Sequence, residues 1–226
     1  VFASRPRALF AVNSHLSRDI DQQGLRFFLE CGYIPGAYSI HREIRRLPPA
    51  HYLLADHDGV HIKRYWEFRH IKANISWEIK REGELLDELD ELVSRSVKAR
   101  MISDVPLGAF LSGGIDSSLA VAMMSRHSSR PVETFTIGFK EPEYDESADA
   151  DAVARHLHTN HHCEYLSVSD LLELMPVFLR EYDEPFFDYS AFPVMAISRL
   201  AKKHMTVSLS GDGGDELYGG YHYYRI

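Results

Sequence analysis

The sequence predicts an α/β fold built on a doubly wound parallel sheet, preceded by a smaller region of mixed α and β structure. From about residue 76 onward, short apolar segments alternate with longer segments of helical periodicity, and alternation on that scale requires parallel crossovers. Two glycine-rich loops that contain acidic residues follow predicted strands, where α/β sheets bind their ligands. We therefore expect a domain boundary near residue 75, with domains at residues 1–75 and 76–226.

The composition is that of a globular protein, with 45% hydrophobic and 26% charged residues. A net charge of -8 argues against a nucleic-acid partner, which would need clustered Lys and Arg. No apolar run approaches the roughly 18 residues of a membrane span, and the N-terminus lacks the organisation of a signal peptide. We expect a cytoplasmic protein with no membrane partner. Cys31 and Cys163 lie outside any CxxC spacing and predict neither a disulfide framework nor a zinc site.

The first region is expected to hold one helix and one hairpin. Asp21 can cap a helix over Gln22–Cys31, and Gly32 can end it in the left-handed conformation. Two apolar, aromatic-rich segments with turn-forming residues between them predict the hairpin. Its expected strands are residues 51–55 and 60–66. Residues 69–77 have weak periodicity and are expected to cross between the domains.

The second region begins with an amphipathic helix at residues 82–101, where leucines and valines recur at helical spacing. Strands and helices then alternate, and their lengths suit a sheet covered by helices on both faces. The expected strands are residues 107–111, 132–139, 162–166 and 206–209. The expected helices are residues 115–127, 147–157, 170–180 and 191–204.

The string LSGGIDSS joins the first of these strands to a helix and has the features of an anion cradle. Gly113 and Gly114 allow the backbone to approach a phosphate closely, and the amides of the first helical turn favour an anion. Asp116 would repel phosphate unless a divalent metal bridges the two, so we infer Mg²⁺. The simpler alternative is a tight turn whose Ser and Asp cap the helix. The candidate nucleotide-binding residues are Leu111, Ser112, Gly113, Gly114, Asp116, Ser117 and Ser118.

Two further strand ends are candidates for the same site. Ile137 ends a strand whose backbone can read an adenine edge, although an ordinary buried strand has the same pattern. The loop at residues 210–216 combines three glycines with three carboxylates, which suits close backbone approach and a hard cation. A purely structural turn is the alternative. The P-loop pattern GxxxxGK[ST] is absent from the sequence, so a kinase-like P-loop is not predicted.

Taken together, these motifs resemble one enzyme family. The string SGGIDSS is similar to the pyrophosphate-binding loop of the N-type ATP pyrophosphatases. Residues 106–118 (PLGAFLSGGIDSS), 134–139 (TFTIGF) and 208–221 (SLSGDGGDELYGGY), in this order, resemble the asparagine synthetase branch. The resemblance implies an adenine nucleotide alpha hydrolase-like sheet that uses ATP and Mg²⁺.

The resemblance also implies roles for single residues. Asp116 and Asp215 match the positions that coordinate magnesium, and Ser210 and Gly211 match positions that lie against the nucleotide. Asp212 stands where the family has an acidic residue near the reacting carboxyl group, so it is the candidate catalytic residue.

Two segments remain open to more than one interpretation. Residues 181–190 (EYDEPFFDYS) resemble a stretch that borders the acyl-acceptor pocket of the family, but a solvated acidic loop has the same composition. The candidate pocket residues are Asp183, Asp188 and Ser190. The histidines at 156, 158, 161 and 162 have counterparts in the family that hold no metal, so we favour a structural role for them.

The front of the chain resembles the closing part of the family's class II glutaminase domain, an α+β fold of the Ntn type. The similar stretches are residues 2–9 (FASRPRAL) and 47–53 (LPPAHYL), with Arg5 where the pattern usually has Glu. The family's nucleophile is an N-terminal cysteine, whereas position 1 is Val and Cys31 lies in a predicted helix. The resemblance implies a parent protein with more sequence on both sides. We expect the present segment alone to hydrolyse no glutamine.

The implied function is ATP- and glutamine-dependent amide synthesis through an acyl-adenylate, with release of AMP and pyrophosphate. Aspartate is the first choice of substrate, and ammonia from glutamine is the nucleophile. Related amidation of a sugar, closure of a β-lactam or lasso-peptide ring, and a non-catalytic ATP-binding module stay open as alternatives. The sequence does not determine the acyl substrate, the nucleophile or the oligomeric state, and a homodimer is one compatible assembly.

Overall fold

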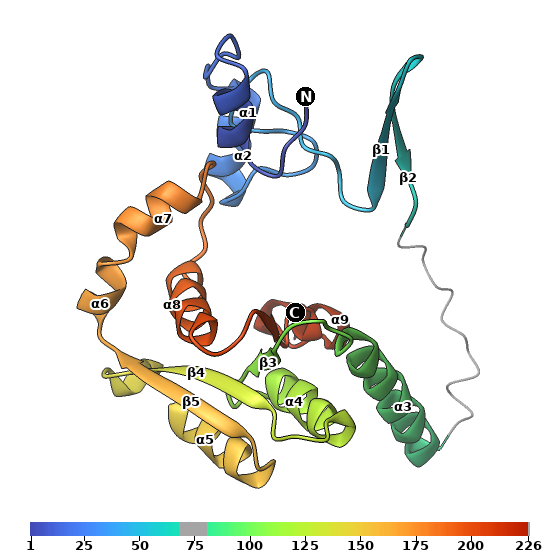
Figure 1. Ribbon diagram of the computed structural model, residues 1–226, viewed down its shortest axis with the longest axis vertical. Coiled ribbons are helices and arrows are strands. Elements are labelled where there is room, and N and C mark those ends of the chain that lie inside the picture. Colours follow the sequence, from blue (N-terminus) through green and yellow to red (C-terminus); the bar gives the residue numbers. More distant parts are fainter. Residues whose placement is uncertain (68–80, 226) are drawn as a thin grey trace. The chain divides into compact units, whose positions relative to one another are not determined.

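The computed structural model describes residues 1–67 and 81–225, which form two compact units (Figure 1). The first unit comprises Val1–Asn74 and Met175–Tyr189, and the second comprises Ile75–Leu174 and Ser190–Ile226. The chain therefore leaves the second unit at Met175 and returns to it at Ser190. The expected boundary at residue 75 and the expected crossing at 69–77 lie outside the described residues.

The first unit contains the predicted helix and hairpin. Helix α2 (Gln22–Cys31) begins where the Asp21 carboxylate accepts a hydrogen bond from the Gly24 amide at 2.8 Å, and it ends at Gly32 with φ of 79°. An antiparallel hairpin follows the helix. Its strands are β1 (His51–Asp56) and β2 (Gly59–Arg64). The unit also holds α1 (Pro6–Val12), which was not predicted.

The second unit is built on a parallel sheet, as predicted. Its strands are β3 (Leu107–Phe110), β4 (Glu133–Phe139), β5 (Asn160–Leu166) and β6 (Val207–Leu209), in the order β5-β4-β3-β6. The chain moves from β3 outward to β4 and β5 and then returns to the other side of β3. A topological switch point therefore lies between β3 and β6, and α/β sheets bind ligands at such points.

Helices cover both faces of this sheet, which makes it doubly wound (Figure 1). One face carries α3 (Glu82–Arg100), α4 (Ile115–His127) and α5 (Ser147–His156). Its buried core consists of Ala109, Leu111, Val121, Met124, Val132, Ala150 and Ala154. The other face carries α8 (Ala191–Lys202), where Leu200 and Ala201 pack against the fully buried Phe135.

The single helix expected at residues 170–180 is wrong, because the structure has two helices there. These are α6 (Val168–Leu172), in the second unit, and α7 (Met175–Glu181), in the first. Pro176 is the second residue of α7, and a proline fits the first turn of a helix but not its interior. The other predicted elements of the second unit agree with the structure to within two residues at each end.

Short elements at loop ends were also missed. They are η2 (Pro142–Tyr144), α9 (Gly214–Tyr218) and η3 (His222–Arg225). Within the described part of the chain, no helix combines the length and the apolar character that crossing a membrane requires.

Candidate nucleotide-binding site

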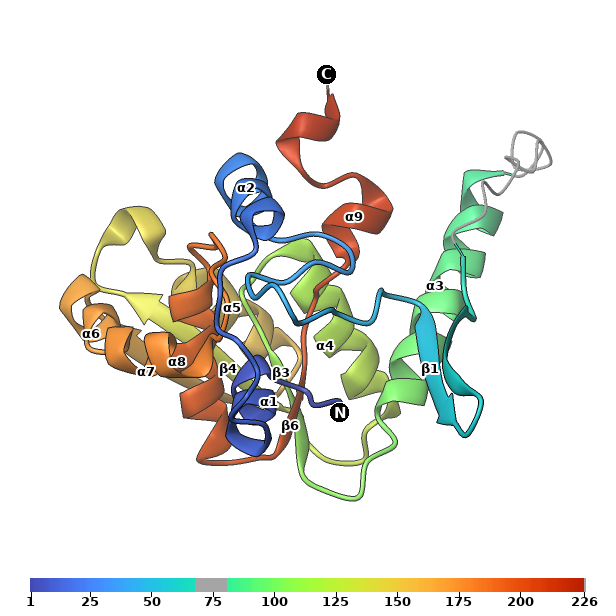
Figure 2. The same ribbon diagram turned by 90° about the horizontal axis from the view of Figure 1, so that it is seen from above.

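The two glycine-rich loops meet at the switch point of the second unit. Because β3 and β6 are paired neighbours, the segments that follow them leave the sheet side by side (Figure 2). A Cβ atom on Gly211 would lie 2.8 Å from the backbone nitrogen of Ser117. A Cβ atom on Gly214 would lie 2.5 Å from Oδ2 and 2.6 Å from Oδ1 of Asp116. Only glycine allows this approach, which brings the Asp116 carboxylate against the second loop.

The first loop is held by its own serines. The hydroxyls of Ser112 and Ser117 lie 2.9 Å apart, and the Ser112 hydroxyl accepts a hydrogen bond from the Gly114 amide at 3.2 Å. The Ser117 hydroxyl also accepts from the Ser112 amide at 3.2 Å. Gly113 has φ of 84°, which favours glycine. The turn is thus preformed by contacts within the motif itself.

The start of α4 favours the anion cradle over the simple capped turn. The N-cap residue is Gly114, which has no side chain that could accept hydrogen bonds from the amides of the first turn. The amides of the first turn of this 13-residue helix therefore remain available for an anion. The hydroxyl of Ser118, in the same turn, is buried and has no hydrogen-bond partner within the described part of the chain. A buried hydroxyl without a partner costs free energy that a bound ligand can recover.

The strand β4 anchors the first loop from the side. The Thr136 hydroxyl donates to the carbonyl of Leu111, and the Leu111 amide donates to the carbonyl of Phe135 at 2.9 Å. Ile137 follows Thr136 and lies beyond Phe135, which pairs with the last residue of β3. The structure therefore places Ile137 near the start of the loop. The sequence did not predict that the Thr136 hydroxyl anchors this loop.

The second loop orients its own acidic residues. The Ser210 hydroxyl donates to Asp212 Oδ2 at 2.9 Å, which fixes the carboxylate of the candidate catalytic residue. Gly213 has φ of 95° and is the N-cap of α9, and the carbonyl of Asp215 accepts from the Gly220 amide at 3.0 Å. The Asp215 carboxylate lies against the backbone of Gly220. Small residues thus surround both of the predicted metal ligands.

A tyrosine follows this loop and bonds to one of its acids. The Tyr221 hydroxyl donates to Glu216 Oε1 at 2.8 Å. This hydrogen bond, with burial and the nearby charges of Glu216 and Asp215, raises the pKa of Tyr221 to about 12. Tyr221 therefore stays protonated at neutral pH.

The donor set at these loops fits magnesium better than a transition metal. Asp116 lies against Gly214, the residue directly before Asp215. Magnesium is usually held by one or two carboxylates and completes its shell with water and substrate phosphate. Within the described residues there is no group of three or more His, Cys, Asp or Glu that could hold a metal by itself. A magnesium ion at Asp116 and Asp215 would therefore need phosphate oxygens to complete its coordination.

The residues predicted for the acyl-acceptor pocket are divided between the two units. Asp183 and Asp188 belong to the first unit, and Ser190 is the residue before α8 in the second. Asp183 accepts hydrogen bonds from the amide of Arg7 at 2.9 Å and from its side chain. Burial opposes ionisation of Asp183, but these bonds outweigh it and hold its pKa below the ordinary value. The pocket role of these three residues stays a prediction.

Comparison with known protein families shows which family the chain belongs to. The model of the asparagine synthase family matches residues 88–226, which is more than half of the chain. The chain belongs to the asparagine synthase family. A glutamine amidotransferase domain model matches residues 1–66. Both regions of the predicted resemblance, and the predicted fold class, are thereby confirmed.

Curated members of the asparagine synthase family align with nearly the whole chain. A putative glutamine-hydrolysing asparagine synthetase of Methanocaldococcus jannaschii is 39% identical over 225 residues, which cover 98% of this chain and 42% of the relative. Glutamine-hydrolysing asparagine synthetase 1 of Bacillus subtilis is 32% identical over 226 residues, covering 99% of this chain and 34% of the relative. The chain thus spans less than half the length of these relatives.

Among solved structures, the chain is similar to an NH3-dependent NAD synthetase from Campylobacter jejuni. The TM-score is 0.42 at 14% identity, with 60% of each chain covered. A likeness of this size adds nothing to the family assignment.

Proposed function

We propose that the full-length protein is a glutamine-dependent asparagine synthetase. The carboxylate of aspartate attacks the α-phosphate of ATP, which forms an acyl-adenylate and releases pyrophosphate. Ammonia released from glutamine then displaces AMP to give the amide. The observation that carries this proposal is the contact between the two glycine-rich loops, which sets Asp116 against Gly214 at the switch point of the sheet.

The chain's own groups support the first half-reaction by positioning and by charge stabilisation. The free amides at the start of α4, with the hydroxyls of Ser112, Ser117 and Ser118, would bind the pyrophosphate part of ATP. Fixed donors of this kind stabilise the charge that develops on a leaving group. The strand end at Ile137 would contact the adenine, as the sequence predicts.

The acidic residues of the two loops have separate roles in this proposal. Asp116 and Asp215 would hold Mg²⁺, which when bound offsets the negative charge of the phosphates. Asp212 is held by Ser210 and would lie near the reacting carboxyl group of the substrate. The proposed substrates are small molecules of the cytoplasm, and we propose no nucleic-acid partner.

Pyrophosphate release by the full-length protein tests the proposal. We expect release with ATP, magnesium and glutamine to depend strictly on aspartate. Asp116→Asn should lower the rate by about 10²-fold or more, because the substitution removes a charge that anchors the metal, and it should leave glutamine hydrolysis intact. Asp151→Asn is the matched control, since Asp151 pairs with Arg155 on the surface of α5. Pyrophosphate release that does not depend on aspartate would contradict the proposal. So would an Asp116→Asn enzyme that makes asparagine at the wild-type rate.

A further inference from the structure

The segment Met175–Tyr189 belongs to one domain by sequence and to the other by packing. It lies within the stretch at 88–226 that matches the asparagine synthase family. In the structure it packs with Val1–Asn74, the part of the chain that includes the glutamine amidotransferase match. The chain therefore makes an excursion from the synthetase sheet into the glutaminase-like unit and back.

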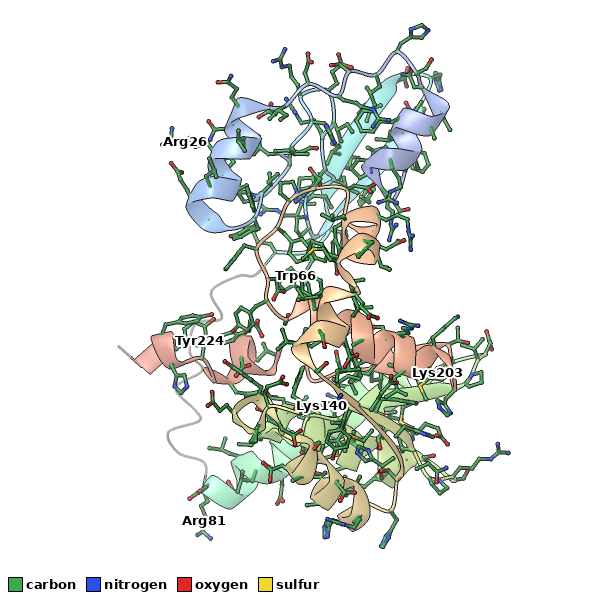
Figure 3. The ribbon with its side chains drawn as sticks, turned by 90° about the vertical axis from the view of Figure 1, so that its left-hand side faces the viewer. Arg26, Trp66, Arg81, Lys140, Lys203 and Tyr224 are labelled. Carbon is green, nitrogen blue, oxygen red and sulfur yellow. The ribbon has the colours of Figure 1, made fainter. Side chains whose placement is uncertain are left out.

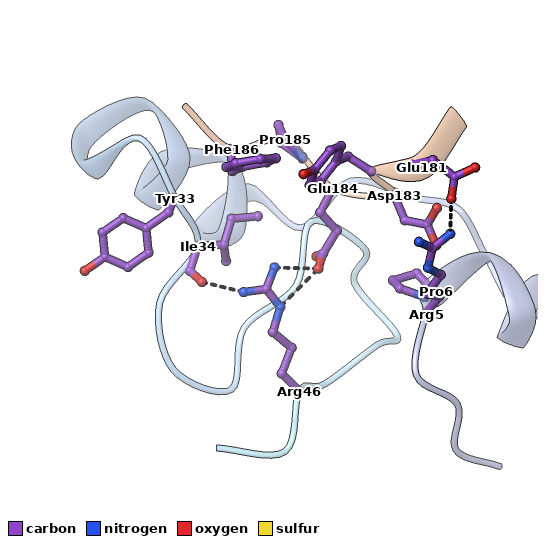
Figure 4. Close-up of a pocket in the computed structure, with 11 residues that line it drawn as sticks. Arg5, Pro6, Tyr33, Ile34, Arg46, Glu181, Asp183, Glu184, Pro185 and Phe186 are labelled. Atoms are coloured by element: carbon purple, nitrogen blue, oxygen red, sulfur yellow. Dashed lines mark hydrogen bonds and ion pairs between the residues drawn. The ribbon is translucent and has the colours of Figure 1, made fainter. Parts of the chain in front are cut away.

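Arginines of the glutaminase-like unit bind three acidic residues of this excursion. Figure 4 shows two of the pairs, Arg5 with Glu181 and Arg46 with Glu184. Arg5 Nη1 donates to Glu181 Oε2 at 2.7 Å, and Arg7 binds Asp183 through its amide and its side chain. Arg46 Nε donates to Glu184 Oε2 at 3.0 Å. Arg5 and Arg46 line a cavity of about 240 Å³ together with Glu181 and Asp183. Each of these charged groups already has a partner inside the unit. The cluster is therefore better suited to holding the segment in place than to binding a ligand.

Glu184 is the most completely bonded of the three acids. Its Oε1 accepts from the Ser39 hydroxyl at 2.8 Å and from the Ile40 amide at 2.7 Å, while its Oε2 accepts from Arg46. Arg46 is itself fixed, because its Nη1 donates to the carbonyl of Ile34 at 2.7 Å. Only 12% of the Glu184 side chain is exposed. Both carboxylate oxygens are thus occupied by groups that are themselves held in place.

The chain beyond Glu184 is fixed a second time before it re-enters the synthetase unit. The Phe187 amide donates to the carbonyl of Gly32 at 2.6 Å, and a Cβ atom on Gly32 would lie 3.3 Å from Cβ of Phe187. Ser190 and then α8 follow, and the helix packs on Phe135 of the central sheet through Leu200 and Ala201. A short stretch of chain therefore joins the bonds around Glu184 to a core helix of the synthetase unit.

We propose that Glu184 is a positioning residue that couples the glutaminase-like unit to the acyl-acceptor side of the synthetase. Only Asp188 and Tyr189 separate Phe187 from Ser190, so a change at Glu184 can reach the start of α8 along a short stretch of chain. The reaction at one site is thereby kept in step with the other. This inference rests on the proposed function for its activity readout, but its structural basis can be tested separately.

The activity test measures coupling in the full-length protein with the variant Glu184→Gln. This change keeps the size of the side chain but puts an amide where Arg46 needs an acceptor. We expect the glutamate formed per pyrophosphate released to rise about threefold to tenfold, while synthesis with ammonium as the nitrogen source stays near the wild-type rate. The matched control is Glu30→Gln, because Glu30 pairs at 2.7 Å with Arg26 and both side chains are exposed. Figure 3 labels Arg26 on α2.

Hydrogen exchange tests whether Glu184 holds the segment Met175–Tyr189, and it requires no enzymatic activity. In Glu184→Gln the amides of Ile40 and Phe187 should exchange faster than in the wild type and in Glu30→Gln. If exchange rises but the coupling ratio of an active enzyme does not, the coupling inference is wrong while the proposed function stands. If exchange is unchanged, Glu184 does not hold the segment and the inference fails. A wild-type protein that makes no asparagine would contradict the proposed function. The exchange result would still show whether Glu184 holds the segment Met175–Tyr189 in place.

Discussion

At the scale of the residue, glycine decides whether the two loops of the candidate site can meet. Gly211 approaches the backbone at Ser117, and Gly214 approaches the carboxylate of Asp116. Neither position leaves room for a methyl group. Because glycine carries no side chain, it does not cover the oxygens of the Asp116 carboxylate. A metal ion shared with phosphate needs access to these oxygens.

Gly214→Ala is therefore expected to displace Asp116. The new methyl group would overlap both carboxylate oxygens, so aspartate-dependent pyrophosphate release should fall by about 10²-fold, as after loss of a charge-stabilising group. The measurement is steady-state release by the full-length protein at saturating ATP.

Gly83→Ala serves as its control. Gly83 lies in the first turn of α3, and a Cβ atom there would have no neighbour within 4 Å. Alanine should keep the activity and raise helix stability by about 0.5–1 kcal/mol. Equal losses in the two variants would show that the effect at Gly214 is not specific to Asp116.

At the scale of the element, the stability of the excursion Met175–Tyr189 should decrease as the pH becomes acidic. Burial raises the pKa of Glu184, but bonds from Arg46, Ile40 and Ser39 outweigh it and hold the pKa below the ordinary value. The folded form therefore binds the proton more weakly than the unfolded form. The contribution of Glu184 is complete above the unfolded pKa of about 4.3 and is lost as the pH falls through the folded pKa.

The wild type should thus lose more stability than Glu184→Gln between pH 6 and pH 3, by on the order of 1 kcal/mol. Glu181 and Asp183 also have lowered pKa values, because Arg5 and Arg7 bind them, but they are present in both proteins. The difference between the two proteins therefore isolates Glu184. Thermal midpoints measured across this pH range give the answer, and parallel curves would contradict it.

At the scale of the whole molecule, the core beneath α8 holds this helix on the sheet of the synthetase unit. Phe135 is fully buried on β4 and packs against Leu200, Ala201 and Met205. Phe135→Ala should destabilise the synthetase unit by about 3–5 kcal/mol, because it removes a fully buried aromatic ring and leaves a cavity in the core.

Denaturant unfolding of the full-length protein measures this effect. Leu86→Ala on the exposed side of α3 is the control, because 57% of Leu86 is accessible and its loss should cost no more than about 0.5 kcal/mol. Similar shifts for the two variants would mean that Phe135 does not anchor the core.

The sequence by itself determined the parts of this protein that near neighbours encode. Helical spacing, the cap at Asp21, the left-handed stop at Gly32 and the glycine-rich loops after strands all depend on residues within one or two turns of chain. The motifs also indicated the family. Even the break before α7 was readable from Pro176, because proline acts locally.

Only the tertiary structure decided which of these parts meet. Strand β6 pairs with β3 although about a hundred residues separate them, and this pairing alone sets Gly214 against Asp116. By sequence the excursion Met175–Tyr189 belongs to the synthetase, yet Arg5, Arg7 and Arg46 bind its acidic residues in the other unit. Such pairings depend on contacts between distant segments, for which neither propensity nor periodicity carries a signal.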